Sequence, residues 1–238
     1  MLTIAQVSQT TTLNDPNPTE LSDFALSDFE LGDVIFDYPC TLSNPETISV
    51  PNEQNIPDFY LIYQGRVRLL GRSQAPQSGQ LQDVSVLLLE ANETFGADRL
   101  FNQTPLPYRA VAASPVQVAR IPATDLLPLL EQFPQLKAYL LIQTLQRERL
   151  IFLKSLTALR SLPGHHLRHL RSHLLEETLV AGTDLAVATP ASTGRFWLRA
   201  GEIQSRSTSR VPAVGDSWGH PDIVPDDWVA TTELRIYH

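Results

Sequence analysis

Residues 59–70 have the sequence FYLIYQGRVRLL, in which two runs of β-prone residues flank a Gln-Gly step. Aromatic and β-branched residues favour strands, and the glycine at position 65 can adopt the positive φ of a tight turn. The pattern predicts a β-hairpin centred on Gly65. Further short β-rich runs, bounded by Gly, Pro and Asn, lie at 34–36, 47–50, 84–89, 110–113 and 116–121. Short strands in succession favour a barrel or a sandwich.

After Pro122 the pattern becomes helical. Residues 125–132 and 134–159 carry leucines at helical spacing among Gln, Arg and Glu, and Pro134 suits the first turn of a helix. A third leucine stripe, Leu167, Leu170 and Leu174, follows Pro163 and predicts another helix. The expected fold class is α+β, mainly β.

The end of the chain repeats the order of its first half. The aligned positions are Gly32 with Gly182, 60–62 with 196–198, Gly65 with Gly201, Phe95-Gly96 with Trp218-Gly219, 111–112 with 229–230, and Val116 and Val118 with Leu234 and Ile236. The recurrence of one glycine, aromatic and strand pattern predicts a tandem duplication. Gly65 and Phe95 are 30 positions apart, whereas Gly201 and Trp218 are only 17 apart, so the second copy lacks most of a hairpin.

This alignment divides the chain into three parts. Residues 1–20 are rich in Thr, Asn, Gln and Pro and are expected to form a flexible leader. Residues 21–155 form the first copy with its C-terminal helices. Residues 156–238 form the second, reduced copy, which stops inside its last strand because His238 aligns with Arg120. The chain is therefore expected to be part of a longer protein.

Composition limits the function. Of 238 residues 42% are hydrophobic and 18% charged, the net charge is -8, and the first 65 residues contain ten Asp and Glu but no Lys or Arg. Such a chain is a poor nucleic-acid binder. It has no apolar run of membrane-spanning length and no charged start of a secretory signal, so we expect a cytosolic location without membrane insertion. The single Cys40 excludes an internal disulfide and a thiolate zinc site.

The order of these features resembles the cyclic nucleotide-binding domain, the β-roll of catabolite-activator-type regulators and kinase regulatory subunits. The residues that carry the resemblance are Gly32, 35–36, 59–62, Gly65, Val67, Phe95-Gly96 and Arg109-Ala110. It covers residues 21–159 and, more loosely, 156–238. The resemblance implies two tandem, jelly-roll-like β-rolls with flanking helices, the second reduced.

In that family a cassette of the form F-G-E-L-A, a spacer and P-R-A binds the cyclic phosphate through backbone amides and the arginine, while the glutamate binds the ribose. The matching positions here are the candidate ligand-binding residues Phe95, Gly96, Ala97, Asp98, Arg109 and Ala110. Alanine stands at the glutamate position, Tyr108 replaces the proline, and the spacer is longer. The resemblance thus implies a degenerate cassette. Arg109 is either an anion ligand or a surface arginine, and Asp98 is alternatively a helix cap or a solvated carboxylate.

The second copy has no such arginine between Gly219 and Val229. A cyclic nucleotide is therefore a candidate ligand of the first copy alone, and no resident cofactor is expected.

Two other groups of polar residues have simpler roles than metal binding or catalysis. His165, His169 and His173 share a predicted helix face, but Arg168 and Arg171 flank them, which favours a solvated basic face over a metal site. No G-x-S-x-G, G-x-x-x-x-G-K-[ST] or H-E-x-x-H motif occurs, so no catalytic site is expected.

Two hypotheses of function follow. Residues 59–70, 95–98 and 106–110 resemble the N-terminal region of cyanobacterial peptidase-containing ABC exporters, which implies a regulatory or docking module whose partners are other domains of the parent, a protein substrate or a small effector. Cys40 lacks the Gln and His context of such a peptidase. The alternative is a catabolite-activator-type transcription regulator, but the segment after Ser161 resumes the β-roll pattern where a helix-turn-helix would be needed.

Overall fold

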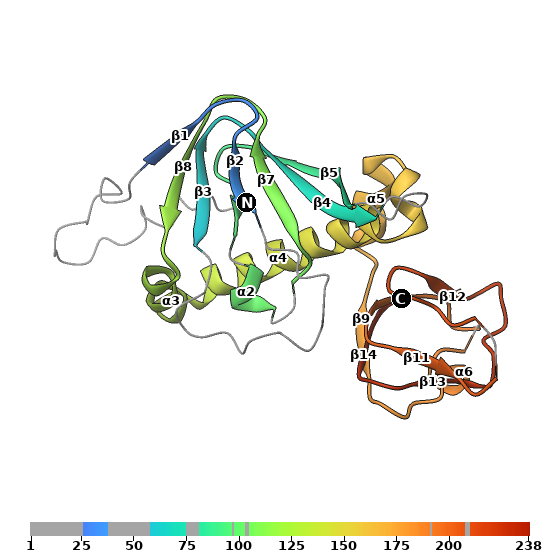
Figure 1. Ribbon diagram of the computed structural model, residues 1–238. Coiled ribbons are helices and arrows are strands. Elements are labelled where there is room, and N and C mark those ends of the chain that lie inside the picture. Colours follow the sequence, from blue (N-terminus) through green and yellow to red (C-terminus); the bar gives the residue numbers. More distant parts are fainter. Residues whose placement is uncertain are drawn as a thin grey trace. The chain divides into compact units, whose positions relative to one another are not determined.

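The computed structural model describes residues 26–37, 58–74, 81–96, 98–102, 105–190, 192–207 and 210–238. The expected leader at 1–20, the strand at 47–50, Cys40 and Ala97 lie outside the described residues. The chain divides into two compact units, the first formed by residues up to 72 and 85–145, the second by residues 73–84 and 146–238 (Figure 1).

The first unit is built from two four-stranded antiparallel sheets, of which the end of β4 and the start of β5, within residues 73–84, belong to the second unit. One sheet has the order β1-β8-β3-β6, and the other has the order β2-β7-β4-β5. The strands are β1 (Leu26–Phe29), β2 (Val34–Asp37), β3 (Phe59–Gln64), β4 (Val67–Gln74), β5 (Leu81–Leu89), β6 (Thr94–Phe95), β7 (Tyr108–Ala112) and β8 (Val116–Ile121). This architecture agrees with the expectation of a mainly β fold.

One short helix lies between β6 and β7, and two longer helices follow β8. They are α2 (Asp98–Phe101), α3 (Ala123–Gln132) and α4 (Pro134–Ser155), of which the last continues into the second unit. Apolar side chains of α3, α4 and β3 form one buried cluster, with Leu126, Leu130 and Leu140 beside Phe59 and Ile121. The leucine pattern after Pro122 therefore marks a packed helical face, as predicted.

The predicted hairpin at 59–70 is wrong in its pairing. Both strands form, and Gly65 has φ +88°, but β3 pairs with β8 in one sheet while β4 pairs with β7 in the other. Gly65 is thus a corner between sheets. A Cβ there would lie 2.2 Å from the Pro115 carbonyl oxygen, because the β3–β4 corner packs on the β7–β8 corner. Two hydrogen bonds join these corners, from Ala113 N to Arg66 O and from Arg66 N to Ser114 Oγ.

The long predicted helix 134–159 ends early, at Ser155. Thr157 has an extended backbone, and its hydroxyl accepts a hydrogen bond from Leu159 N while donating one to Leu153 O. This side chain caps the new 3-10 helix η4 (Ala158–Ser161) and diverts the chain from the α-helix. None of the helices in the described ranges is long and apolar enough to cross a bilayer.

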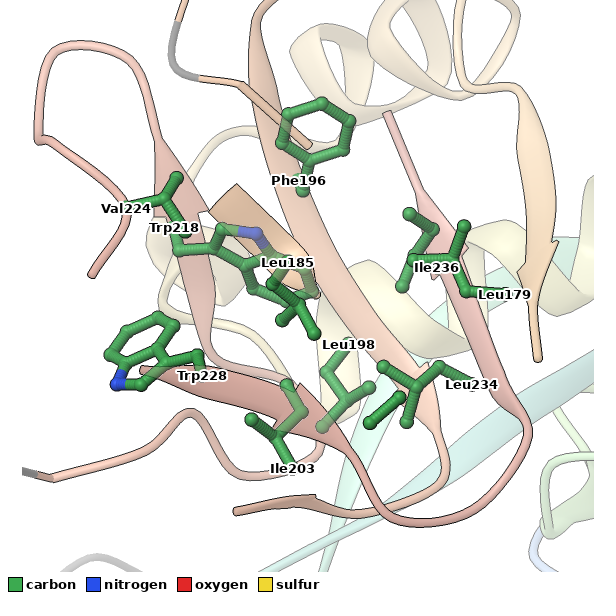
Figure 2. Close-up of a cluster of buried hydrophobic side chains, with 11 residues drawn as sticks. Leu179, Leu185, Phe196, Leu198, Ile203, Trp218, Val224, Trp228, Leu234 and Ile236 are labelled. Atoms are coloured by element: carbon green, nitrogen blue, oxygen red, sulfur yellow. The ribbon is translucent and has the colours of Figure 1, made fainter. Parts of the chain in front are cut away.

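The second unit contains α5 (Gly164–Arg171), α6 (Leu185–Ala188) and six strands: β9 (Glu176–Leu179), β10 (Arg195–Ala200), β11 (Ile203–Ser205), β12 (Ser217–Gly219), β13 (Trp228–Ala230) and β14 (Leu234–Tyr237). Its sheets have the orders β12-β10-β14-β9 and β11-β13. Figure 2 shows the core of this unit, where Leu198, Leu234 and Ile236 gather with Trp218 and Phe196.

The pairing in the second unit follows that of the first. Gly201 is again a corner between sheets, with φ +98° and a Cβ position 2.4 Å from the Glu233 carbonyl oxygen. The corner hydrogen bonds recur as Thr231 N to Glu202 O and Glu202 N to Thr232 Oγ1. Gly182 N donates to Ala230 O, and Gly32 N likewise donates to Ala112 O.

Candidate ligand-binding cassette

The candidate residues surround the end of β6 and the start of β7 in the first unit. Phe95 ends β6, Gly96 follows it, Asp98 begins the short helix α2, and Arg109 and Ala110 lie on β7. A Cβ at Gly96 would lie 2.4 Å from the carbonyl oxygen of Asp58, and its φ is +96°. Only glycine fits this backbone position.

Aromatic rings fill the space between the two sheets at this point. Tyr60 and Phe95 from one sheet stack with their centroids 5.0 Å apart. Phe36, from the other sheet, lies edge-on to both rings and 5.4 Å from the ring of Tyr108. Because Phe95 and Tyr108 are fully buried, this aromatic cluster belongs to the core of the β-roll.

The hydroxyl of Tyr108 joins the cassette residues. It donates to Asp98 Oδ2 over 2.5 Å and accepts from the backbone N–H of Gly96 over 2.9 Å. Asp98 begins α2 and is only 4% exposed, so the alternative of a solvated carboxylate is wrong. A cassette amide that could bind an anion therefore binds a side chain of the protein itself.

Arg109 lies on the other face of the same strand. Side chains alternate along a strand, and Tyr108 and Ala110 face the core, so Arg109 points to the opposite face. There its Nη2 lies 2.8 Å from Asp37 Oδ2, and Arg72 Nη2 lies 2.8 Å from Asp37 Oδ1. One carboxylate thus holds two guanidinium groups.

This ion cluster affects the acidity of Asp37. Burial acts to raise its pKa, but the hydrogen bonds and charges of Arg109 and Arg72 together outweigh burial, and the pKa lies below its usual value. Asp37 therefore stays ionised across the neutral range and keeps Arg109 in place. Its side chain is 40% exposed, so salt should weaken the cluster.

The structure thus brings Phe95, Gly96 and Asp98 together around Tyr108, places Ala110 beside them on the core side, and directs Arg109 elsewhere. The sequence reasoning missed the contributions of Tyr108, Asp37 and Arg72. One signal was available: tyrosine stands directly before Arg109 where the family has proline, and an aromatic side chain that faces the core places the next residue on the opposite face of the strand.

In the second unit, buried aromatic residues lie beside Gly219. Phe196 and Trp218 stack with centroids 6.0 Å apart, and Trp218 Nε1 donates to Thr189 Oγ1 over 2.8 Å. Gly219 has φ +88°, and a Cβ there would lie 2.5 Å from the Gly194 carbonyl oxygen.

The rings of His165 and His166 lie 4.0 Å apart, and the rings of His169 and His173 lie 4.9 Å apart. The expected helix face shared by His165, His169 and His173 is wrong for His173, because α5 ends at Arg171 and His173 follows in a turn. Within the described ranges, no three His, Cys, Asp or Glu side chains are arranged to hold a metal ion.

Comparison with known proteins agrees with the fold of the first unit. Residues 45–133 match the family model of the cyclic nucleotide-binding domain. No curated protein matches the chain.

Solved structures similar to this chain include a catabolite activator protein, a transcriptional regulator and PfPKA-R. The Thermus thermophilus catabolite activator protein is 26% identical over 53% of this chain and 52% of its own, with a TM-score of 0.37. A transcriptional regulator from Thermotoga maritima is 17% identical over 52% of this chain and 82% of its own, with a TM-score of 0.37. The cAMP-bound PfPKA-R is 13% identical over 90% of this chain and 69% of its own, with a TM-score of 0.32.

Proposed function

We propose that this chain is a non-catalytic regulatory or docking module, made of two related β-rolls, whose first cassette is closed to cyclic nucleotides. The observation that carries the proposal is the position of Tyr108. Its hydroxyl engages Gly96 N–H and Asp98, and its burial turns Arg109 toward Asp37 on the other face of the sheet.

The orientation of Arg109 prevents binding because of what a cyclic phosphate requires. An anion needs several N–H donors and a guanidinium converging on one point. Here an amide and the arginine of the cassette point to different faces of the sheet, and each already has a partner. Moving Arg109 to the core side would break its ion pair and reverse the alternation of β7, which the burial of Tyr108 and Ala110 opposes.

The proposal that the second unit is a reduced copy of the first is supported by matched details. Stacked aromatic pairs, Tyr60 with Phe95 and Phe196 with Trp218, hold equivalent places beside Gly96 and Gly219. The sheet order β6-β3-β8-β1 corresponds to β12-β10-β14-β9, strand by strand.

We further propose that this module belongs to a larger protein with a cytosolic part. In that protein it would regulate an exporter of the peptidase-containing ABC type. The support is the resemblance of residues 59–70, 95–98 and 106–110 in sequence. A catabolite-activator-type transcription regulator is the second candidate. The gene sequence beyond the codon for His238 separates them, since a cysteine peptidase with membrane spans favours the exporter and a basic helix-turn-helix favours the regulator.

The closed cassette predicts that restoring the family glutamate does not restore binding. Ala97→Glu should bind a fluorescent cyclic AMP analogue no better than the unmodified chain, because Arg109 remains on the opposite face. Fluorescence anisotropy is the measurement. An arginine–phosphate contact is worth about 1.5–3 kcal/mol, so in a functional cassette Arg109→Ala would weaken binding roughly ten- to more than a hundredfold. The proposal would be refuted if the Ala97→Glu variant bound the analogue at micromolar concentration and if adding Arg109→Ala to that variant abolished the binding.

A further inference from the structure

The second unit has an open pocket of about 590 Å³ on the outer side of its larger sheet. It is lined by residues of η4, β10, the loop that begins at Arg210, and β12 and β13, including Leu159, Arg195, Trp197, Arg210, Ser217 and Trp228. All of them belong to the second unit. The volume is within the usual range for small-molecule sites.

This pocket is separate from the position equivalent to the cassette. Phe196, Leu198 and Trp218 point into the core, whereas Arg195, Trp197 and Ser217 alternate with them and face the other way. Trp197 and Ser217 are direct cross-strand partners of β10 and β12. The pocket therefore opens on the outer face of this sheet, and Trp228, a member of the buried core cluster, lines it from β13.

One cation of the pocket is held in a fixed orientation. The Nε of Arg195 donates to Ser217 Oγ over 3.0 Å, and its Nη1 donates to the His220 carbonyl oxygen over 3.0 Å. Asp222 Oδ2 lies 3.7 Å from Nη1, but that carboxylate is 73% exposed and its pairing is correspondingly weak. A guanidinium fixed by neutral partners keeps most of its charge available to an anion.

A second cation, Arg210, is exposed on the neighbouring loop, and its side chain has no hydrogen bond or ion pair in the described part of the chain. The pocket also contains the carboxylate of Asp216, whose Oδ2 accepts from Ala213 N–H over 3.1 Å. The charged residues of the lining itself are two arginines and one aspartate, whereas Asp222, the exposed partner of Arg195, lies outside the lining.

Aromatic surface accompanies this charge. Trp197 is half-buried, and Trp228 is almost buried, with an indole N–H that lacks an acceptor in the described ranges. Indole rings stack with planar groups, and guanidinium groups bind carboxylates and phosphates. The loop is fixed in place because Gly215 packs so closely that a Cβ would lie 2.1 Å from the Leu156 carbonyl oxygen.

We propose that the second unit binds a planar aromatic anion in this pocket. The ring lies against Trp197 and Trp228, and the carboxylate or phosphate binds between Arg195 and Arg210. This gives the reduced unit a ligand site of its own, at a place unrelated to the cassette of the first unit.

The three tryptophans make a sharp test possible, because all of them lie in the second unit. The full chain, with 15N-labelled tryptophan, is titrated with benzoate, phenyl phosphate and the neutral benzyl alcohol, and the three indole N–H resonances are followed by NMR. We expect saturable shifts of Trp197 and Trp228 with at least one anion, which identifies the preferred anionic group. Trp218 should not shift, because its N–H is bound to Thr189 inside the core.

Two variants test whether the positive charge of Arg210 binds the anion. Arg210→Ala should weaken binding of the anion about tenfold, since one charge-assisted hydrogen bond is lost. Arg206→Ala removes the same charge outside the pocket and should leave binding unchanged. The proposal is overturned if neither anion gives saturable shifts, if benzyl alcohol binds as well as the anions, or if Arg210→Ala and Arg206→Ala behave alike.

Discussion

Replacing Glu148 by alanine is expected to destabilise the second unit by about 3–5 kcal/mol. Glu148, in the last turns of α4, forms an ion pair with Arg199 of β10, and the two side chains are only 4% and 5% exposed. Removing the carboxylate leaves a buried guanidinium without its counter-charge, which costs far more than the loss of a surface pair. Urea unfolding followed by tryptophan fluorescence measures the effect, because every tryptophan lies in the second unit.

A matched control is Glu177→Ala, whose partner His238 lies 3.8 Å away in an exposed pair. This substitution should cost about 0–1 kcal/mol. The double variant Glu148→Leu, Arg199→Met should recover much of the loss, since apolar residues can replace a buried pair. A cost below about 1 kcal/mol for Glu148→Ala would show that the pair does not hold α4 to the sheet.

The second large effect is expected at the corner glycine of the second unit. Gly201→Ala places a Cβ 2.4 Å from the Glu233 carbonyl oxygen and 2.6 Å from Leu234 Cδ2, at φ +98°. Backbone strain alone costs about 1–3 kcal/mol, and the overlap with backbone adds to it, because the two corners cannot separate without breaking their hydrogen bonds. We expect a total loss of about 3 kcal/mol or more in the same urea experiment.

Gly182→Ala isolates the contribution of the overlap. Gly182 has φ +86°, but nothing lies within 4 Å of its Cβ position. Alanine there should cost only the strain of the backbone. Equal losses for the two variants would mean that the close approach of the corners contributes nothing to stability.

The local structure was largely predictable from sequence, while its pairing was not. The strands at 59–64 and 67–74 and the positive φ of Gly65 follow from β propensity and from glycine. The hairpin was wrong because pairing depends on β7 and β8, which lie about 50 positions later in the chain and offer each strand a different partner. Three short strands, β1, β6 and β9, were missed because they depend on their neighbours in the sheet.

The candidate cassette shows the same limit. Sequence located Phe95, Gly96, Asp98 and Arg109 but could not pair Arg109 with Asp37, which is 72 positions away. The sequence shows that Tyr108 replaces the proline, but only its burial in the structure shows what the replacement does. A tyrosine inside the roll needs hydrogen-bond partners, and Gly96 and Asp98 supply them.

Isothermal titration calorimetry with Arg109→Ala beside the unmodified chain tests the central claim, that the first cassette is closed, most directly. Cyclic AMP, cyclic GMP and cyclic dinucleotides are the ligands. At micromolar ligand we predict that no heat of binding depends on Arg109. The unmodified chain and the Arg109→Ala variant should therefore give the same isotherms. Micromolar or tighter binding to the unmodified chain that Arg109→Ala weakens roughly tenfold or more would contradict the account, because the arginine would then have left Asp37 to bind the phosphate.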